Sequence, residues 1–210
     1  MLKIIASIFS YIFHPLLLLT YLLLMIMLIN PYLFGHTSFE GHNLLLIQIF
    51  FSTALLPSIA ILVMKALGML ESLRMEDRQE RIGPFIVSGI FYLWIFINVR
   101  DNGEIPLSYR GFVLAATVAL FLSFLINLIQ KVNIHAVSAG ILLSSVIIML
   151  ATYSYSLVSL TSLLMGAIIF TGMVGTSQLI LKQGEPIDIY GGFFIGFIAQ
   201  AVALFFVFSL

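Results

Sequence analysis

The stretch IIASIFSYIFHPLLLLTYLLLMIMLIN, residues 4–30, decides the fold class, because it is apolar along most of its length and contains no Asp, Glu, Lys or Arg. A helix needs about 20 such residues to cross the hydrocarbon core of a lipid bilayer. The stretch is too long for the apolar core of a signal peptide, and no small-residue cleavage site follows it. We therefore expect it to be a retained first membrane span.

The rest of the chain has the same apolar character. Hydrophobic residues make up 61% of its 210 residues and charged residues 9%, with a mean hydropathy of +1.17, whereas a soluble domain is about 45–50% apolar and about 25% charged. This composition predicts an all-α protein, a polytopic transmembrane helix bundle of six or seven spans, with residues 1–210 as a single domain. The apolar segments, of which the third is short, cover about residues 4–30, 44–69, 85–99, 111–130, 133–151, 157–181 and 189–210.

Prolines and small residues predict how these helices bend and pack. Pro15 and Pro57 lie inside the first two segments, where each is expected to kink its helix. Small residues that recur at every fourth position allow helix backbones to approach closely in lipid. Two such rows occur, Ala136-Gly140-Ser144 and Gly192-Gly196.

The charged residues exclude some functions and indicate an orientation. The formal net charge is zero, which gives no electrostatic argument for a nucleic-acid partner. The absence of cysteine excludes disulfides and cysteine-ligated metals, and we expect no cofactor. The N-terminal side holds seven of the nine basic residues, so the positive-inside rule places that side in the cytoplasm. The seven are Lys3, Lys65, Arg74, Arg78, Arg81, Lys131 and Lys182, against Arg100 and Arg110 on the other side.

Three polar clusters fall on this N-terminal side and could converge on one site. They are residues 71–84 (ESLRMEDRQERIGP), residues 131–135 (KVNIH) and residues 177–188 (SQLILKQGEPID). If the local segments are helical, Lys131 and His135 share one helix face, and so do Arg74 and Arg81. Arginine side chains that can donate two parallel hydrogen bonds, a lysine and a helix N-terminus near His135 are suited to bind a phosphate. The alternative is that the first cluster is a solvated loop.

The spacing within these clusters resembles the type 2 phosphatidic acid phosphatase superfamily of membrane lipid-phosphate phosphatases, in particular a bacterial branch of it. Arg74 and Arg81 are separated by six residues and followed by Pro84, as in the first family motif. The second motif, Pro-Ser-Gly-His, corresponds to residues 132–135 (VNIH) and keeps only His135. The third motif, Ser-Arg, five residues, His, three residues, Asp, corresponds to residues 177–188 (SQLILKQGEPID). The resemblance implies a multi-pass protein integral to the bacterial inner membrane.

The resemblance also implies roles for individual residues. His135 corresponds to the general acid that protonates the leaving alcohol, and Asp188 to the carboxylate that orients the nucleophile. The phosphate of a phosphorylated lipid, of the phosphatidic acid or polyprenyl phosphate type, would be bound without a metal ion. Gly184 stands where the nucleophilic His belongs and Gln178 where an Arg belongs, so this chain is expected to be a degenerate member. The implied phosphate-binding residues are Arg74, Arg81, Lys131, Asn133, Ser177 and Gln178.

Several alternatives remain open. His135, His14 or Asp188 could replace the missing nucleophile. Purely structural roles are the alternative for two of these residues. His14 could cap the backbone at the proline kink, and Asp188 could be a favourable acid in the first turn of a helix opened by Pro186. A metal site on a short loop with His36, Glu40 and His42 is disfavoured because a fourth ligand is missing. The candidate functions are a lipid-phosphate phosphatase with altered chemistry, a catalytically inactive relative that binds phosphorylated lipid, and an unrelated small transporter or channel.

Overall fold

The computed structural model describes residues 1–34, 43–75, 77–153, 156 and 158–209. Within these ranges the chain forms helices and turns without β-strands, and seven helical segments are long and apolar enough to cross a membrane. They are Leu2–Ile29, Asn43–Ala66, Gln79–Arg100, Leu107–Asn127, Ile134–Thr152, Leu160–Ile180 and Pro186–Val207. The predicted all-α bundle of membrane-spanning helices is confirmed, and the chain is an integral, multi-pass membrane protein.

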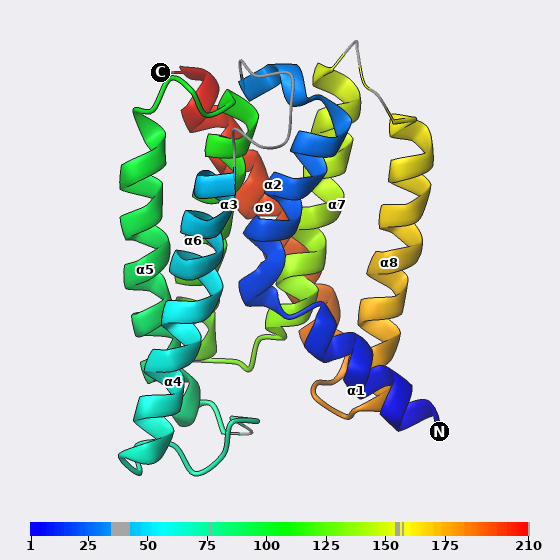
Figure 1. Ribbon diagram of the computed structural model, residues 1–210. Helices are drawn as coiled ribbons and strands as arrows, with labels where there is room; N and C mark the ends of the chain where they lie inside the picture. The colour runs from blue at the N-terminus through cyan, green and yellow to red at the C-terminus, as the bar shows by residue number, and fades with distance from the viewer. Residues whose placement is uncertain (35–42, 76, 154–155, 157, 210) are drawn as a thin grey trace.

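Three of the spans are interrupted or composite, whereas four are single helices (Figure 1). The first span consists of α1 (Leu2–Ile12), the 3-10 turn η1 (Pro15–Leu17) and α2 (Leu18–Ile29), which the 3-10 turn η2 (Pro31–Phe34) follows. The second consists of α3 (Asn43–Phe50), the π-helix η4 (Phe51–Leu55) and α4 (Leu56–Ala66), and the third of the 3-10 turn η5 (Gln79–Arg81) and α5 (Ile82–Arg100). The single helices are α6 (Leu107–Asn127), α7 (Ile134–Thr152), α8 (Leu160–Ile180) and α9 (Pro186–Ser209).

The third span is longer than the predicted segment 85–99. The prediction began this span after Pro84, but Pro84 lies in the first turn of α5, where a backbone N–H has no partner within the helix and proline is tolerated. The predicted break at Pro15 is confirmed, since α1 ends at Ile12 and the chain restarts as η1. Figure 1 shows α1 leaving the direction of α2 and lying against the lower part of α8. Pro57 lies in the first turn of α4, directly after the π-helix that widens the second span.

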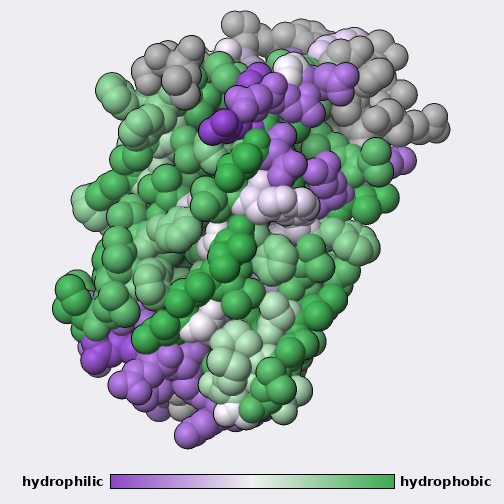
Figure 2. Space-filling view, turned by 90° about the vertical axis from the view of Figure 1, so that its left-hand side faces the viewer, coloured by the Kyte–Doolittle hydropathy of each residue, from purple (hydrophilic) through white to green (hydrophobic). Residues whose placement is uncertain are grey.

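The connections alternate between two ends of the bundle. The start of α1 and the α4–α5, α6–α7 and α8–α9 connections lie at the same end in Figure 1, which is called the N-terminal end below. This is the arrangement predicted from the seven basic residues. On the face shown in Figure 2, hydrophilic residues gather toward the two ends, and hydrophobic residues cover most of the band between them. That distribution is what a bilayer requires of a spanning protein.

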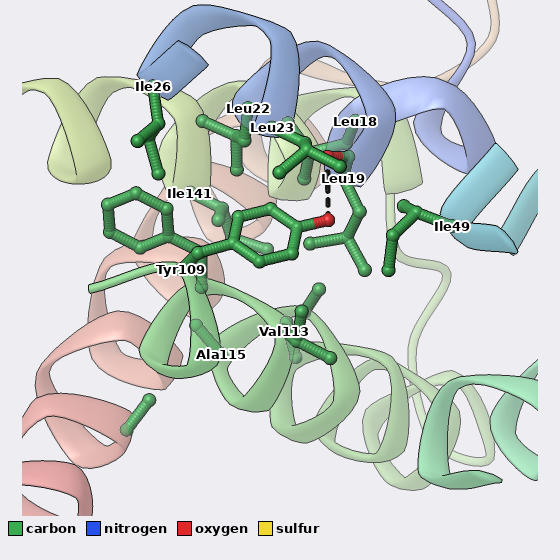
Figure 3. Close-up of a cluster of buried hydrophobic side chains, with 14 of the residues drawn as sticks. Leu18, Leu19, Leu22, Leu23, Ile26, Ile49, Tyr109, Val113, Ala115 and Ile141 are labelled. Atoms are coloured by element: carbon green, nitrogen blue, oxygen red, sulfur yellow. Dashed lines mark hydrogen bonds between the residues drawn. The ribbon is translucent and has the colours of Figure 1, made fainter. Parts of the chain in front are cut away.

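The core of the bundle lies around α6, whose Tyr109 joins it to the first span. Tyr109 is fully buried, and Figure 3 shows it reaching from α6 into a layer of leucines on α2. Its hydroxyl donates a hydrogen bond to the carbonyl oxygen of Leu19 at 3.0 Å. A buried phenol needs such a partner, because an unpaired hydroxyl in an apolar interior is costly.

The two predicted rows of small residues meet at the contact between α7 and α9. A Cβ atom added to Gly140 would lie 2.5 Å from the carbonyl oxygen of Phe193, and one added to Gly192 would lie 2.7 Å from that of Asn133. Gly196 approaches the backbone of Val137 in the same way. The glycines therefore let the two backbones touch, and this contact fixes α9 against the start of α7.

Candidate functional site

An open groove of about 830 Å³ lies at the N-terminal end, where the α4–α5, α6–α7 and α8–α9 connections meet. We call it the end groove. Charged side chains of both signs line it, together with apolar residues from the start of α9. The lining consists of Asp77, Arg78, Gln130, Lys131, Leu179, Lys182, Gly184, Glu185, Pro186, Ile187 and Asp188. In the part of the chain that the structure describes, the direct ion pair joins Arg100 to Asp101 at the opposite end, so these groove charges do not pair directly with one another.

Lys182 owes its position in the groove to the end of α8. Its backbone adopts a left-handed conformation with φ of 54°. The N–H of Lys182 donates to the carbonyl oxygen of Leu179 at 3.1 Å, and the N–H of Gln183 donates to that of Gln178 at 3.1 Å. This is the Schellman ending of a helix, in which glycine usually occupies the left-handed position. A lysine there is unusual and places a cation on the groove wall.

Asp188 lies in the first turn of α9 and caps this helix. One carboxylate oxygen accepts a hydrogen bond from the backbone N–H of Glu185 at 2.9 Å, and the other faces the side-chain amide of Gln130 at 3.5 Å. Pro186 opens α9, so an acid in this turn also suits the helix dipole. The structural interpretation of Asp188 is therefore confirmed, and its carboxylate also interacts electrostatically with Arg81.

Arg81 does not line the groove, but its side chain links the α4–α5 connection to the α6–α7 connection. Its Nε donates to the carbonyl oxygen of Met75 and its Nη1 to that of Val132, both at 2.8 Å. Arg81 bonds to Val132 and Asp188 faces Gln130, so both reach the α6–α7 connection that precedes His135.

Four polar side chains from three helices form what we call the inner polar network. Asn133 Nδ2 donates to Gln178 Oε1 at 3.3 Å, and Gln178 Nε2 donates to Ser10 Oγ at 3.2 Å. Ser10 Oγ also lies 3.5 Å from Nε2 of His135. Asn133 Oδ1 accepts from the backbone N–H of Ala136 at 3.0 Å and so caps α7. Asn133 and Gln178 are 4% and 1% exposed, so their amides satisfy each other inside the bundle.

His14 stands beside this network although it lies far from His135 in the sequence. The two imidazole rings are 5.5 Å apart between centroids and nearly perpendicular. Nδ1 of His14 accepts the backbone N–H of Leu16 at 3.3 Å, which confirms the interpretation of His14 as the cap of the proline break. Neutral His14 then carries its proton on Nε2, so it presents an N–H donor rather than a nucleophilic lone pair on that nitrogen.

Gly184 lies where the second and third polar clusters meet. A Cβ atom added there would be 3.3 Å from Cβ of Asp188 and 3.4 Å from Nδ2 of Asn133. Any side chain at this position would therefore start between the groove and the inner polar network.

The other predicted site residues lie as follows. Arg74 is exposed in the α4–α5 connection, outside the described lining of the groove. Ser177 is buried, and its hydroxyl donates to the carbonyl oxygen of Val174 at 2.8 Å. Two predicted geometries are wrong: α7 begins at Ile134, so Lys131 shares no helix face with His135, and Arg74 shares none with Arg81 because only the turn η5 precedes α5. Ile134 does place a helix N-terminus beside His135, as predicted.

Sequence reasoning did not assign Arg78, Lys182 and Gln130 to the site, nor Ser10 to the network. Arg78 is held against the α6–α7 connection by hydrogen bonds to the carbonyl oxygen of Ile129 and from the side chain of Asn127. The positions of these missed residues depend on which segments meet in the folded bundle. The sequence indicates only that the segments lie on the same side of the membrane.

The described residues contain no group of three or more His, Cys, Asp or Glu side chains that could hold a metal ion. The candidate ligands His36, Glu40 and His42 lie outside the described residues. Comparison with protein-family models, with curated proteins and with solved structures finds no match to this chain.

Proposed function

We propose that this protein, a multi-pass protein of the bacterial inner membrane, binds the phosphate group of a phosphorylated lipid in the end groove without hydrolysing it. The observation that carries the proposal is the convergence of Arg78, Lys131 and Lys182 on one groove beside Gly184 and Asp188. Lysine and arginine donors bind phosphate strongly through charge-assisted hydrogen bonds. The proposal also agrees with the resemblance to type 2 phosphatidic acid phosphatases.

The surroundings of the groove favour a lipid over a free phosphate ion. Leu179 and Ile187 line the groove and are 46% and 61% exposed, and Ile129 on the neighbouring connection is 83% exposed. The proposal places these side chains, at the end of the bundle, where headgroups meet hydrocarbon. A ligand with both a phosphate and an apolar part would contact the cations and these side chains together.

The side chains around the groove argue against hydrolysis. Gly184 has no side chain that could attack phosphorus. Gln178 stands where the phosphatase family that this chain resembles has an Arg. Its side chain is neutral and forms hydrogen bonds with Asn133 and Ser10. His135 is half-buried, and its Nε2 faces Ser10 rather than the groove. Loss of a nucleophile removes roughly 10⁴–10⁶ in rate in the serine-enzyme analogy.

The test compares binding and phosphate release with purified protein in nanodiscs. Phosphatidic acid should bind more tightly than phosphatidylcholine, and the double substitution Lys131→Gln, Lys182→Gln should weaken its binding about tenfold or more, because two charge-assisted contacts are lost. Lys3→Gln is the matched control, since Lys3 is an exposed cation at the same end outside the groove. Equal binding by the double variant and the Lys3 variant would contradict the proposal, and so would phosphate release by the wild type.

A further inference from the structure

We infer that the cleft between α2, α7 and α8 holds one hydrocarbon chain of the lipid whose phosphate binds in the end groove, an inference that rests on the proposed function. This lateral cleft has a volume of about 270 Å³ and is mostly apolar. Phe13 and His14 line it from the proline break, Leu142 from α7, and Gly166 and Phe170 from α8.

The length and direction of the lateral cleft suit a lipid chain. Along α8 it extends from Ser162 to Val174, which is about 18 Å at 1.5 Å per residue. Because α8 runs from Leu160 to Ile180, the cleft crosses the middle of this helix and reaches toward the end of the span opposite the end groove. It is therefore deeper than one leaflet of about 15 Å, and only a long chain extends along it from the end-groove side.

The lateral cleft and the end groove both have lining residues on α8. Leu179 lines the groove and Val174 lines the cleft, and both are on α8. Five residues of helix separate them by about 7.5 Å along the axis. The same five residues turn the helix by about 140°, so a chain from a phosphate beside Lys182 would pass Leu179 and run around α8 to enter the cleft.

Three polar side chains that border the lateral cleft, those of Ser138, Tyr21 and His14, have hydrogen-bond partners in the backbone. Ser138 Oγ donates to the carbonyl oxygen of His135 at 2.8 Å, and Tyr21 Oη donates to that of Ile12 at 2.7 Å. His14 accepts from the backbone N–H of Leu16. Phe13 and Phe170 pack edge to face, with 4.5 Å between their centroids, and present carbon to the cleft. The lining therefore suits hydrocarbon better than a sugar or a peptide.

Gly166 makes the lateral cleft testable. A Cβ atom added at Gly166 meets nothing within 4 Å, so a larger side chain would grow into the cleft without a clash at its base. Gly172 on the same helix also has open space around an added Cβ atom and does not line the cleft. Gly166→Phe and Gly172→Phe are therefore a matched pair that adds the same ring to the same helix.

The experiment measures binding of dioleoyl and dihexanoyl phosphatidic acid to detergent-purified wild type and both variants. The wild type should bind the long-chain lipid more tightly. Gly166→Phe should weaken long-chain binding roughly tenfold, because methylene groups lose their buried site, and should leave short-chain binding unchanged. Gly172→Phe should behave as the wild type, and Gly166→Leu should be intermediate, which separates filling of the cleft from loss of folded protein.

The outcomes separate this inference from the proposed function. Long-chain binding by Gly166→Phe at wild-type strength overturns the inference, and the proposed function stands if the Lys131→Gln, Lys182→Gln variant still binds weakly. Absence of binding of either lipid to the wild type overturns both. A dioleoyl phosphatidic acid carrying a photoreactive group in mid-chain should label peptides from α8 in the wild type and not in Gly166→Phe.

Discussion

Lys182 closes α8 in a left-handed backbone conformation, with its N–H donating to the carbonyl oxygen of Leu179 at 3.1 Å. Glycine adopts this conformation freely, whereas a residue with a Cβ atom pays roughly 1–2 kcal/mol for it. A residue held in an unfavourable conformation is a candidate for a functional role. Lys182 lines the end groove, and the proposed phosphate binding would give its ammonium group such a role.

Replacing this residue should therefore separate stability from binding. We predict that Lys182→Gly raises the free energy of unfolding by about 1 kcal/mol, because the strain is removed, while affinity for phosphatidic acid falls. Thermal unfolding in detergent and lipid binding measure the two effects. Lys182→Arg, which keeps the charge, should bind as the wild type. A Lys182→Gly protein that is more stable and binds equally well would show that the lysine has no part in phosphate binding.

Two adjacent glycines of α9, Gly191 and Gly192, should respond differently to an added side chain, because only Gly192 packs against α7. A Cβ atom at Gly192 would lie 2.7 Å from the carbonyl oxygen of Asn133 and 2.9 Å from Cβ of Ala136, whereas one at Gly191 meets nothing within 4 Å. We predict that Gly192→Ala lowers the free energy of unfolding by about 1–3 kcal/mol. Gly191→Ala should be neutral or slightly stabilising, because alanine favours the helix. Equal thermal stability of the two variants would contradict the close contact.

The spans could be predicted from sequence because membrane insertion depends on local composition. A run of about 20 apolar residues is recognisable without knowing its neighbours. The error occurred at Pro84, where the position of proline within the helix decides whether it is tolerated. The rows around Gly140 and Gly192 were also readable, since spacing along one helix determines its face.

The candidate site was less predictable because it depends on which loops touch. The expected helix face shared by Lys131 and His135 does not exist, because Asn133 caps α7 and leaves Lys131 outside it. The closeness of His14 to His135 arises from the break at Pro15, which is local, and from the packing of η1 and α2 on α7, which is not. A single sequence contains the first fact and not the second.

The orientation of the bundle can be tested because the chain has no cysteine. We predict that the N-terminal end faces the cytoplasm, since it holds seven of the nine basic residues. Ile129→Cys and Asn102→Cys place exposed thiols at the two ends. In intact spheroplasts a membrane-impermeant maleimide should label Asn102→Cys, and should label Ile129→Cys only after permeabilisation. The reverse pattern would place the end groove outside the cytoplasm.

Position 184 decides between an inactive relative and an enzyme with altered chemistry. A side chain there begins between Asp188 and Asn133, so Gly184→His introduces an imidazole beside a carboxylate that could orient it. We predict no release of phosphate from phosphatidic acid or undecaprenyl pyrophosphate by the wild type, and slow release by the double variant Gly184→His, Gln178→Arg. Loss of that release on adding His135→Ala would support His135 as the acid.

The single variants show why both changes are needed. Gly184→His alone supplies a nucleophile but leaves neutral Gln178 facing Asn133, so charge on the transferring phosphate gains no new cation. Gln178→Arg alone supplies the cation without a nucleophile, and it removes a buried amide that Asn133 and Ser10 both contact, so its stability must be measured in parallel. If the folded double variant is as inactive as either single variant, the groove does not hold phosphate in a position for attack from residue 184. Wild-type release that His135→Ala abolishes would instead show that the protein hydrolyses lipid phosphates by a route that does not use residue 184.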